Sequence, residues 1–419
     1  MDKYITRITG KIPNSKKEVS INDIDGKTII FTGINGCGKT LFLRELSKNL
    51  SSLSEKRRIQ RYIQISNDIL KSEQEISSQH GSLRSGIANH RVSSLYQQKE
   101  QLIVQDSTLK IDFNSYETVV NKASENLFVH TFFDATRQYR SVHKNRDQSL
   151  STYSDFIRYG KSTPLSIDVS ERFEGYLVSF IESCYIAYAM RSEIESKEKA
   201  DAWMLSVESD LQHLFEDSSL KFSYEEKSKR FFISQNGKEP FDLSVLSSGY
   251  SAILKIYSEL ILKVEFKSIT PQELSGIVFI DEIDAHLHVS LQKKILPFLT
   301  KAYPNLQFIV STHSPFVLQS VDNAIVYDLT NNEQMEDLSL YSYESILKGL
   351  LGVETKSNEL ILLVDNLAEL IPKLENKILE HKDDALRIIS KLREVEAKLD
   401  SKSKVVLLMA EQALDDLGE

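Results

Sequence analysis

Residues 33–40 read Gly33-Ile34-Asn35-Gly36-Cys37-Gly38-Lys39-Thr40 and match the pattern G-x-x-x-x-G-K-[ST]. A strand predicted at Thr28–Thr32 precedes this glycine loop, and a helix predicted at Leu41–Leu50 follows it. Glycines let backbone N–H groups turn inward at a helix N-terminus, where they attract phosphate. We expect phosphates to be held by Asn35, Gly36, Cys37, Gly38, Lys39 and Thr40, with the Thr40 hydroxyl on magnesium. We interpret Cys37 as a small loop residue rather than a catalytic thiol.

A second motif is an apolar strand that ends in two acids. Residues Gly276–Ile280 form the strand, and Asp281 and Glu282 follow it. In phosphoryl transfer an aspartate at such a position holds magnesium, and a neighbouring acid orients or deprotonates the attacking water. Apolar strands often end in acids, so this motif gains its meaning from the glycine loop.

Two more segments carry small polar residues and histidines. They are Leu246-Ser247-Ser248-Gly249-Tyr250, which precedes the acidic strand, and Ser311-Thr312-His313-Ser314-Pro315, which follows the next predicted strand, Leu306–Val310. The order GINGCGKT, LSSGY, IVFIDEIDAHLH, STHSPF resembles the ATP-binding cassette (ABC) superfamily. The similar branch contains the chromosome-maintenance (SMC) and overcoming-lysogenisation-defect (OLD) ATPases. The resemblance covers about residues 1–50 and 125–330 and implies an α/β P-loop fold with a mixed sheet.

The same resemblance implies a role for individual residues. Lys39 and Thr40 would bind the phosphates of ATP and Mg²⁺, Asp281 would complete the magnesium site, and Glu282 would be the catalytic carboxylate. His313 would contact the terminal phosphate as a second catalytic group; the alternative is a buried structural histidine. Asp284 would lie at a dimer seam.

The segment Ser247, Ser248 and Gly249 would act as the signature that closes over the ATP of another subunit. Tyr250 departs from the glutamine or glutamate that usually follows the signature glycine. The glutamine that contacts magnesium in the family is assigned to Gln138, with Arg137 as the alternative nucleotide-side residue.

The chain is expected to form three regions. Residues 1–50 and 106–335 would form the ATPase domain in two lobes, residues 51–105 an inserted helical hairpin, and residues 336–419 a C-terminal helical region. The insertion is rich in Ser, Gln, Glu, Lys and Arg and has apolar residues spaced three and seven apart, which favours a short coiled-coil arm. Two helices lying flat on the surface are the alternative. Gly81 and Gly86 would lie between the two halves.

Outside these motifs, apolar patterns predict further elements. Predicted strands are Tyr4–Thr9, Glu18–Ile21, Leu109–Phe113, Leu127–Phe133, Leu220–Tyr224 and Arg230–Ser234; predicted helices are Ser170–Ser192, Lys197–Phe215 and one from Gly249. The tail is predicted helical from Tyr343, with Pro372 starting a new turn and Val395 on an apolar face.

Composition limits the class of protein. The 419 residues carry a net charge of -9, so the chain cannot coat nucleic acid as a polycation. The densest basic patch, at Arg137, Arg140, His143, Lys144 and Arg146, is interpreted as a solvated loop or a partner's salt-bridge surface, with phosphate binding as the alternative. The longest apolar runs are too short to cross a bilayer, and the N-terminus has no secretory pattern, so we expect a cytoplasmic protein without a membrane partner.

Residues Ile346–Glu354 and the helical tail resemble the ATPase subunits of bacterial antiphage systems. The Septu and retron-associated ATPases of this group act beside an HNH nuclease, and the PARIS ATPase acts beside a TOPRIM effector. The resemblance implies a head-to-tail dimer or higher oligomer that senses infection, with nucleic acid or a phage protein as trigger, and controls an effector nuclease. The alternative is a DNA-repair or chromosome-maintenance ATPase that clamps DNA. The motor of a transporter fits less well, because the arm and tail have no use there.

Overall fold

The computed structural model describes residues 4–12, 14–78, 82–104, 107–140, 150, 152–336, 338, 341–350, 357–376, 379–396 and 399–418. The chain forms two compact units, Met1–Ile346 and Leu347–Glu419, which are described separately below. The division falls at residue 346 rather than at the expected 335. Leu338 and Ile346 are both buried, so this short segment is packed rather than free linker.

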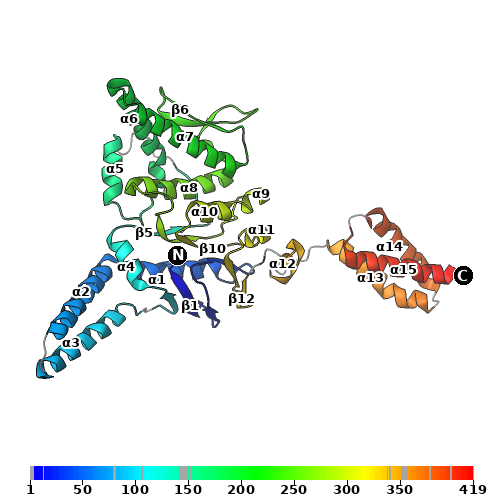
Figure 1. The fold of residues 1–419 in the computed structure, drawn as a ribbon. Helices are drawn as coiled ribbons and strands as arrows, with labels where there is room; N and C mark the ends of the chain where they lie inside the picture. Colours follow the sequence, from blue (N-terminus) through cyan, green and yellow to red (C-terminus); the bar gives the residue numbers. More distant parts are fainter. Residues whose placement is uncertain are drawn as a thin grey trace. The chain divides into compact units, whose positions relative to one another are not determined.

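The first unit is built on a six-stranded sheet with the order β12-β11-β3-β10-β9-β5 (Figure 1). Its strands are β3 (Thr28–Thr32), β5 (Phe128–Phe133), β9 (Ser275–Ile280), β10 (Leu306–Ser311), β11 (Ala324–Asp328) and β12 (Glu333–Glu336). Neighbours from β11 to β5 are parallel, and β12 is antiparallel to β11. Every residue of β3, β9, β10 and β11 is buried, as in a sheet covered on both faces. The predicted α/β fold with a mixed sheet is confirmed.

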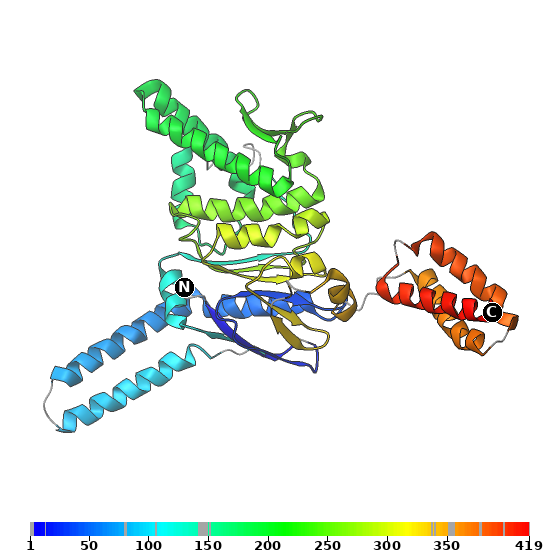
Figure 2. The same cartoon turned by 45° about the vertical axis from the view of Figure 1, so that its right-hand side comes forward.

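Two helices cover the opposite faces of this sheet, as both views show (Figures 1 and 2). His130 of β5 contacts α1 (Lys39–Leu53), where its Nε2 lies 3.0 Å from Ser47 Oγ. The next residue, Thr131, donates to Glu259 of α8 (Ser248–Lys267) at 3.1 Å. Successive side chains of a strand point to opposite faces, so α1 and α8 lie on different sides of the sheet.

A buried ion pair anchors α8 to the sheet. Lys263 and Glu259 approach to 2.6 Å, and their side chains are 1% and 2% exposed. The Lys263 ammonium also donates to the Thr131 hydroxyl. Burial raises the pKa of Glu259, whereas the charge of Lys263 opposes that change.

A second, antiparallel sheet covers the other side of α1. It has the order β2-β1-β4, with β1 at Ile5–Lys11, β2 at Glu18–Ile21 and β4 at Leu109–Phe113. Its apolar side chains, such as Ile8 and Ile111, share one core with Phe42 and Leu46 of α1 and with the central sheet. The predicted strands at these places are confirmed, while α4 (Tyr116–Ser124) was not predicted.

The insertion forms two helices, α2 (Lys56–Ser78) and α3 (Ser82–Gln101), that run side by side (Figure 2). Ile59 and Tyr62 at the start of α2 belong to the core of the first unit. Further along, the Tyr96 hydroxyl donates to Glu73 Oε1 at 2.9 Å. Gly81 lies outside the described residues. The prediction that Gly86 separates the helices is wrong, because α3 begins at Ser82 and a single glycine is tolerated inside a helix at a cost of about 1 kcal/mol.

A helical lobe precedes and includes α8. Its elements are α5 (Tyr153–Ser162), the 3₁₀ turn η1 (Ser170–Arg172), α6 (Phe173–Arg191), α7 (Ile194–Phe215), the turn η2 (Leu243–Val245) and the antiparallel strands β6 (Lys221–Glu225), β7 (Arg230–Ser234) and β8 (Phe241–Asp242). Short helices α9 (Val289–Gln292), α10 (Ile295–Ala302) and α11 (Pro315–Leu318) connect the later strands. None of the helices in the described part of the chain has the length and apolarity that a membrane crossing needs.

After α12 (Tyr343–Gly349), the second unit is a group of helices with its own core. They are α13 (Asn358–Glu375), the turn η4 (Leu379–His381), α14 (Lys382–Glu394) and α15 (Ser401–Gly418). Leu367, Leu392 and Leu399 are buried there. Two predictions are wrong: Pro372 lies inside α13 rather than starting a new turn, and Val395 is 41% exposed. Pro372 lies near the end of α13, where losing one N–H bond disrupts little of the helix.

Candidate functional site

The motifs meet at one edge of the central sheet because of its strand order. β3, β10, β9 and β5 are parallel neighbours, so their carboxyl ends lie side by side. These ends lead into the glycine loop, the segment Thr312–His313, the pair Asp281–Glu282 and the segment Asp134–Gln138. In open α/β sheets the ligand site lies at this edge. Residues that lie far apart in the sequence are therefore brought together at the carboxyl edge of the sheet.

The glycine loop has the geometry of a phosphate cradle. Gly36 and Gly38 have φ angles of 80° and 100°, in the left-handed region that favours glycine. A Cβ atom added to Gly36 would meet nothing within 4 Å, so the loop is open on that side. Gly38 is the N-cap of α1 and provides no side-chain cap, which leaves the first-turn N–H groups of a 15-residue helix available to an anion.

Lys39 lies across the loop. Its side chain is buried, and its ammonium donates to the carbonyl oxygens of Gly33 at 3.0 Å and Ile34 at 3.2 Å. Cys37 is half-buried, with its Sγ atom 3.7 Å from Lys39 Nζ. Asn35 is exposed and Thr40 is half-buried. The donors present thus suit a triphosphate, with an ammonium group and a hydroxyl group at the start of one helix.

Two residues that support this loop were missed by the sequence motifs. The Ile34 N–H group donates to Thr330 Oγ1 at 2.9 Å, and the Thr330 N–H group donates to Asp328 Oδ1 at 2.7 Å. Asp328 is fully buried at the end of β11, next to β3. The strand β11 thereby fixes the start of the glycine loop. The sequence signal for this support is the apolar run Ala324–Asp328, which ends in an aspartate.

The pair Asp281–Glu282 is held tightly by β10. Asp281 is 1% exposed and accepts a hydrogen bond from Ser311 Oγ at 2.5 Å. Ser311 Oγ in turn accepts a hydrogen bond from the Glu282 N–H group at 2.7 Å. Glu282 has a φ angle of 43°, which is uncommon for a residue with a side chain and costs about 1 to 3 kcal/mol. The surrounding hydrogen bonds keep Glu282 in this conformation, with its side chain only half-buried.

Arg137 supplies the rest of that support. Its guanidinium group donates to the carbonyl oxygens of Asp281 at 2.8 Å, Glu282 at 3.2 Å and Ile283 at 2.9 Å, and also to that of Asp134 at 3.2 Å. Burial lowers the pKa of Arg137 to about 10, although three nearby carboxylates oppose this change. Arg137 is buried, so the interpretation of a solvated basic patch is wrong at this residue. Arg140 is exposed, and His143, Lys144 and Arg146 lie outside the described residues.

Asp284 and His313 lie beside the same acids. The Thr312 hydroxyl donates to Asp284 Oδ1, which joins the turn after β9 to the segment after β10. Burial lowers the pKa of His313, and the charge of Lys39 lowers it further. The carboxylates of Asp284, Glu282 and Asp281 act in the opposite direction. This set of interactions brings Lys39, His313 and the three acids into one electrostatic cluster.

The segment Ser247-Ser248-Gly249 begins α8. Both serines are exposed, and Ser247 accepts the Tyr250 N–H group at 3.4 Å as the helix cap. Within the described part of the chain, neither serine forms a hydrogen bond to the glycine loop. A Cβ atom on Gly249 would lie 2.6 Å from the His286 carbonyl oxygen, so only glycine permits this approach.

Tyr250 and Gln138 point to different surroundings. The Tyr250 ring stacks on Phe215 with 4.1 Å between centroids, and its hydroxyl donates to the Phe215 carbonyl at 3.1 Å. This packing into the helical lobe accounts for a tyrosine in place of the usual glutamine or glutamate.

Gln138 is exposed and lines a polar cavity of about 300 Å³ with Arg140 and Lys255. Of the two residues considered for the nucleotide side, Gln138 is the one whose side chain is accessible.

The segment around Gln138 is tied to three elements. Asp134 forms an ion pair with Arg44 of α1 at 2.8 Å. The Tyr139 N–H group donates at 2.9 Å to the hydroxyl of Ser251, which lies in the first turn of α8. Together with Arg137, these contacts connect the helix of the glycine loop, the acidic turn and the helix of the serine segment.

Two known proteins are similar in sequence to part of this chain. The retron Ec83 probable ATPase of Escherichia coli is 33% identical over 154 residues, which cover 33% of this chain and 27% of that protein. The Septu protein PtuA of Bacillus thuringiensis is 30% identical over 161 residues, which cover 34% of this chain and 40% of that protein. The matched regions thus span well under half of these relatives.

A solved structure and a protein family also match. The crystal structure of the SmcHead bound to the C-winged helix domain of ScpA aligns with a TM-score of 0.36 and 14% identity over 79% of this chain and 96% of that chain. The family described as "AAA domain, putative AbiEii toxin, Type IV TA system" matches residues 29–319. This range starts in β3, just before the glycine loop, and runs through the acidic pair to the residues after His313. The chain belongs to this AAA-domain family.

Proposed function

We propose that this chain is an ATPase that binds ATP and Mg²⁺ at the carboxyl edge of its central sheet and acts as the regulatory subunit of a defence system. The observation that carries the proposal is the convergence of the glycine loop, Asp281, Glu282 and His313 on neighbouring parallel strands. Each residue type has a separate task in phosphoryl transfer, and three independent segments supply them.

The residues present divide the work as follows. Backbone N–H groups of the loop and the Lys39 ammonium would hold the phosphates, while Thr40, Asp281 and Gln138 would hold magnesium, an ion that commonly takes few protein ligands. Magnesium, when bound, supplies positive charge that offsets the charge of the phosphates. Glu282 would orient and deprotonate the attacking water. His313, whose pKa is lowered by burial and by the charge of Lys39, would donate a hydrogen bond toward the terminal phosphate.

The signature segment supports a head-to-tail dimer. Ser247 and Ser248 are exposed at the N-terminus of a 20-residue helix and make no hydrogen bond to the glycine loop among the described residues. An exposed helix N-terminus with two hydroxyl groups suits the phosphates held by a second copy. Asp284 would lie at the seam between the copies. We infer that each of the two sites is completed by the other copy.

The role in defence rests on the relatives. Two of them are named as ATPases of retrons and two as Septu PtuA proteins, which agrees with the resemblance to antiphage ATPase subunits. We infer that the nucleotide state of this chain controls a partner effector, with an HNH or TOPRIM nuclease as the partner class. The alternative, a chromosome-maintenance ATPase that clamps DNA, receives less support, because the net charge of -9 opposes DNA binding.

The site is tested with two variants of the purified chain. Lys39→Ala should lose ATP binding in a titration with a fluorescent ATP analogue. Glu282→Gln should retain ATP and accumulate dimers in analytical ultracentrifugation, because the water is no longer activated. Circular dichroism checks that both variants are folded. Equal ATP affinity in the wild type and Lys39→Ala would contradict the assignment of the loop.

The regulatory role is tested by expressing the chain with its neighbouring genes. We expect a nuclease encoded nearby to purify with the wild type, and phage protection to be lost in Lys39→Ala. Binding of DNA by the chain alone, with a steep loss of affinity as salt is raised, would instead favour the clamp.

A further inference from the structure

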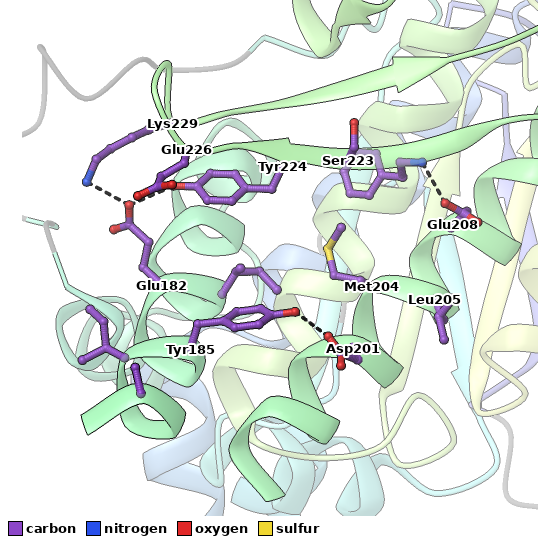
Figure 3. Close-up of a pocket in the computed structure, with 14 residues that line it drawn as sticks. Glu182, Tyr185, Asp201, Met204, Leu205, Glu208, Ser223, Tyr224, Glu226 and Lys229 are labelled. Carbon is purple, nitrogen blue, oxygen red and sulfur yellow. Dashed lines mark hydrogen bonds and ion pairs between the residues drawn. The ribbon is translucent and has the colours of Figure 1, made fainter. Parts of the chain in front are cut away.

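The helical lobe presents an apolar groove on the outside of α6 and α7 (Figure 3). Its volume is about 990 Å³. The groove is formed by one stripe of each helix together with residues of β6 and the turn after it. The α6 stripe is Ile181, Glu182, Tyr185, Ile186 and Ala189, and the α7 stripe is Asp201, Met204, Leu205 and Glu208.

The apolar surface continues past the groove. Six large apolar side chains between residues 185 and 205 are exposed: Tyr185, Ile186, Tyr188, Met190, Ile194 and Leu205. Ile186 is 57%, Met190 81% and Leu205 65% exposed. α6 carries apolar residues on more than one face, and exposed apolar side chains that are grouped together mark a site of interaction. Tyr188, Met190 and Ile194 do not line the groove, so a small molecule bound there would leave them in water, and a macromolecule is the better occupant.

The rim of the groove carries mostly negative charge. Four carboxylates line it, from Glu182, Asp201, Glu208 and Glu226, while two ammonium groups pair with acids of the rim, Lys229 with Glu182 and Lys221 with Glu208. The contacts in Figure 3 hold three of these acids in place: Tyr185 donates to Asp201 at 2.5 Å, Tyr224 and Lys229 each contact Glu182 at 2.8 Å, and the Phe222 N–H group donates to Glu208 at 2.9 Å. Glu226 is exposed. With two lysines against four acids the rim keeps a net negative charge, and Asp201 and Glu226 are its acids that form no ion pair among the described residues.

We propose that this groove binds an amphipathic helix with a basic face, contributed by a partner protein. Apolar side chains of such a helix at i, i+3, i+4 and i+7 would fill the space between the two stripes, and its lysines or arginines would meet the rim carboxylates. The stripe from Ile181 to Ala189 spans about 12 Å at 1.5 Å per residue, which matches about two helical turns. A second copy of this chain fits less well, because a two-fold contact would place the same carboxylates against each other.

The test uses a defined probe on the full-length chain without nucleotide. The probe is a fluorescein-labelled 14-residue helical peptide of leucine and lysine, and its counterpart has glutamate in place of lysine. In fluorescence anisotropy at low salt we expect micromolar binding of the lysine peptide and at least ten-fold weaker binding of the glutamate peptide. Raising salt to 0.5 M should weaken the lysine peptide several-fold.

Variants of the groove locate the binding. Leu205→Ser and Ile186→Ser should each weaken the lysine peptide at least ten-fold, and Glu226→Gln should weaken it two- to three-fold. Leu408→Ser is the matched control, because Leu408 is 61% exposed in the second unit and should leave binding unchanged. Circular dichroism melts confirm that the variants are folded.

Three outcomes would overturn the proposal. They are equal binding of both peptides, equal binding by the groove variants and Leu408→Ser, and a loss of self-association in Leu205→Ser without peptide, which would assign the face to a second copy. The proposal refines the partner class of the proposed function but does not need nucleotide. Failure of ATP binding in the purified chain would therefore leave this test intact.

Discussion

Replacing Arg137 by methionine removes a buried guanidinium group while keeping a side chain of similar length. The change deletes four hydrogen bonds to carbonyl oxygens. At about 1 kcal/mol net for each bond, the loss is about 4 kcal/mol. The carbonyl oxygens lose their donor, and this net value already includes the cost of burying the charged guanidinium group. We therefore expect the free energy of unfolding to fall by about 4 kcal/mol.

Activity should also fall in the part of the protein that stays folded. Without the guanidinium group, the carbonyl oxygens of Asp281, Glu282 and Ile283 lose their hydrogen bonds to residue 137. Glu282 can then leave its uncommon φ angle of 43°. A displacement of about 1 Å in a catalytic group costs about 100-fold in rate. We expect kcat for ATP hydrolysis to fall about 100-fold in Arg137→Met while the affinity for ATP changes less than three-fold.

Three measurements separate positioning from a general structural role. Phosphate release gives kcat and KM, a fluorescent ATP analogue gives affinity, and urea unfolding is followed by the fluorescence of Trp203, the one tryptophan. Arg140→Met is the matched control, because Arg140 is exposed on the same segment. Arg137→Lys should recover part of kcat through a single ammonium donor. An unchanged kcat in Arg137→Met under conditions where the variant is folded, or a free energy of unfolding equal to that of the wild type, would refute this reasoning.

Further predictions concern the sheet and the start of α8. The pKa of His130 is lowered by burial to about 4. As the pH falls, His130 takes up a proton in the unfolded chain at a higher pH than in the folded chain. The free energy of unfolding should therefore fall between about pH 6.5 and 4, by at most about 3 kcal/mol. His130→Gln should lack this part of the pH dependence in urea unfolding. Lys263→Met leaves Glu259 buried without its partner and should cost about 3 to 5 kcal/mol, most of which the double variant with Glu259→Leu should recover. Gly249→Ala places a Cβ 2.6 Å from a carbonyl oxygen and should reduce ATP-dependent dimerisation at least ten-fold in ultracentrifugation, whereas Gly349→Ala, with nothing within 4 Å, should not.

The parts of the fold that could be predicted are those with strong local patterns. The strands before the glycine loop and before Asp281 are continuous apolar runs, and each is followed by polar residues that mark its end. β11 has a similar apolar run, yet no chemical motif follows it and its place in the sheet was not anticipated. A short apolar run alone does not distinguish a strand from part of a buried helix, so its pairing with β3 required the structure.

The candidate site shows the same limit. The motifs predicted which residues gather at the sheet edge, because parallel strands align their carboxyl ends. The choice between Arg137 and Gln138 could not be made from sequence, since the partners of Arg137 lie about 144 to 146 positions away. The reason for glycine at position 249 also could not be predicted from the sequence. In the structure it permits close contact with the His286 carbonyl within the same chain, whereas the resemblance attributed it to the nucleotide of another subunit.

The contact between Gly249 and the His286 carbonyl has a kinetic consequence for an assembly of two copies. The serine segment that would touch the neighbour's nucleotide rests directly on the turn that bears Asp284, and Asp284 is bonded to Thr312 beside His313. Binding of ATP at one site would thereby change the positions of Asp284 and His313 at the other site. Hydrolysis in the pair should consequently be cooperative, with a Hill coefficient for ATP above one.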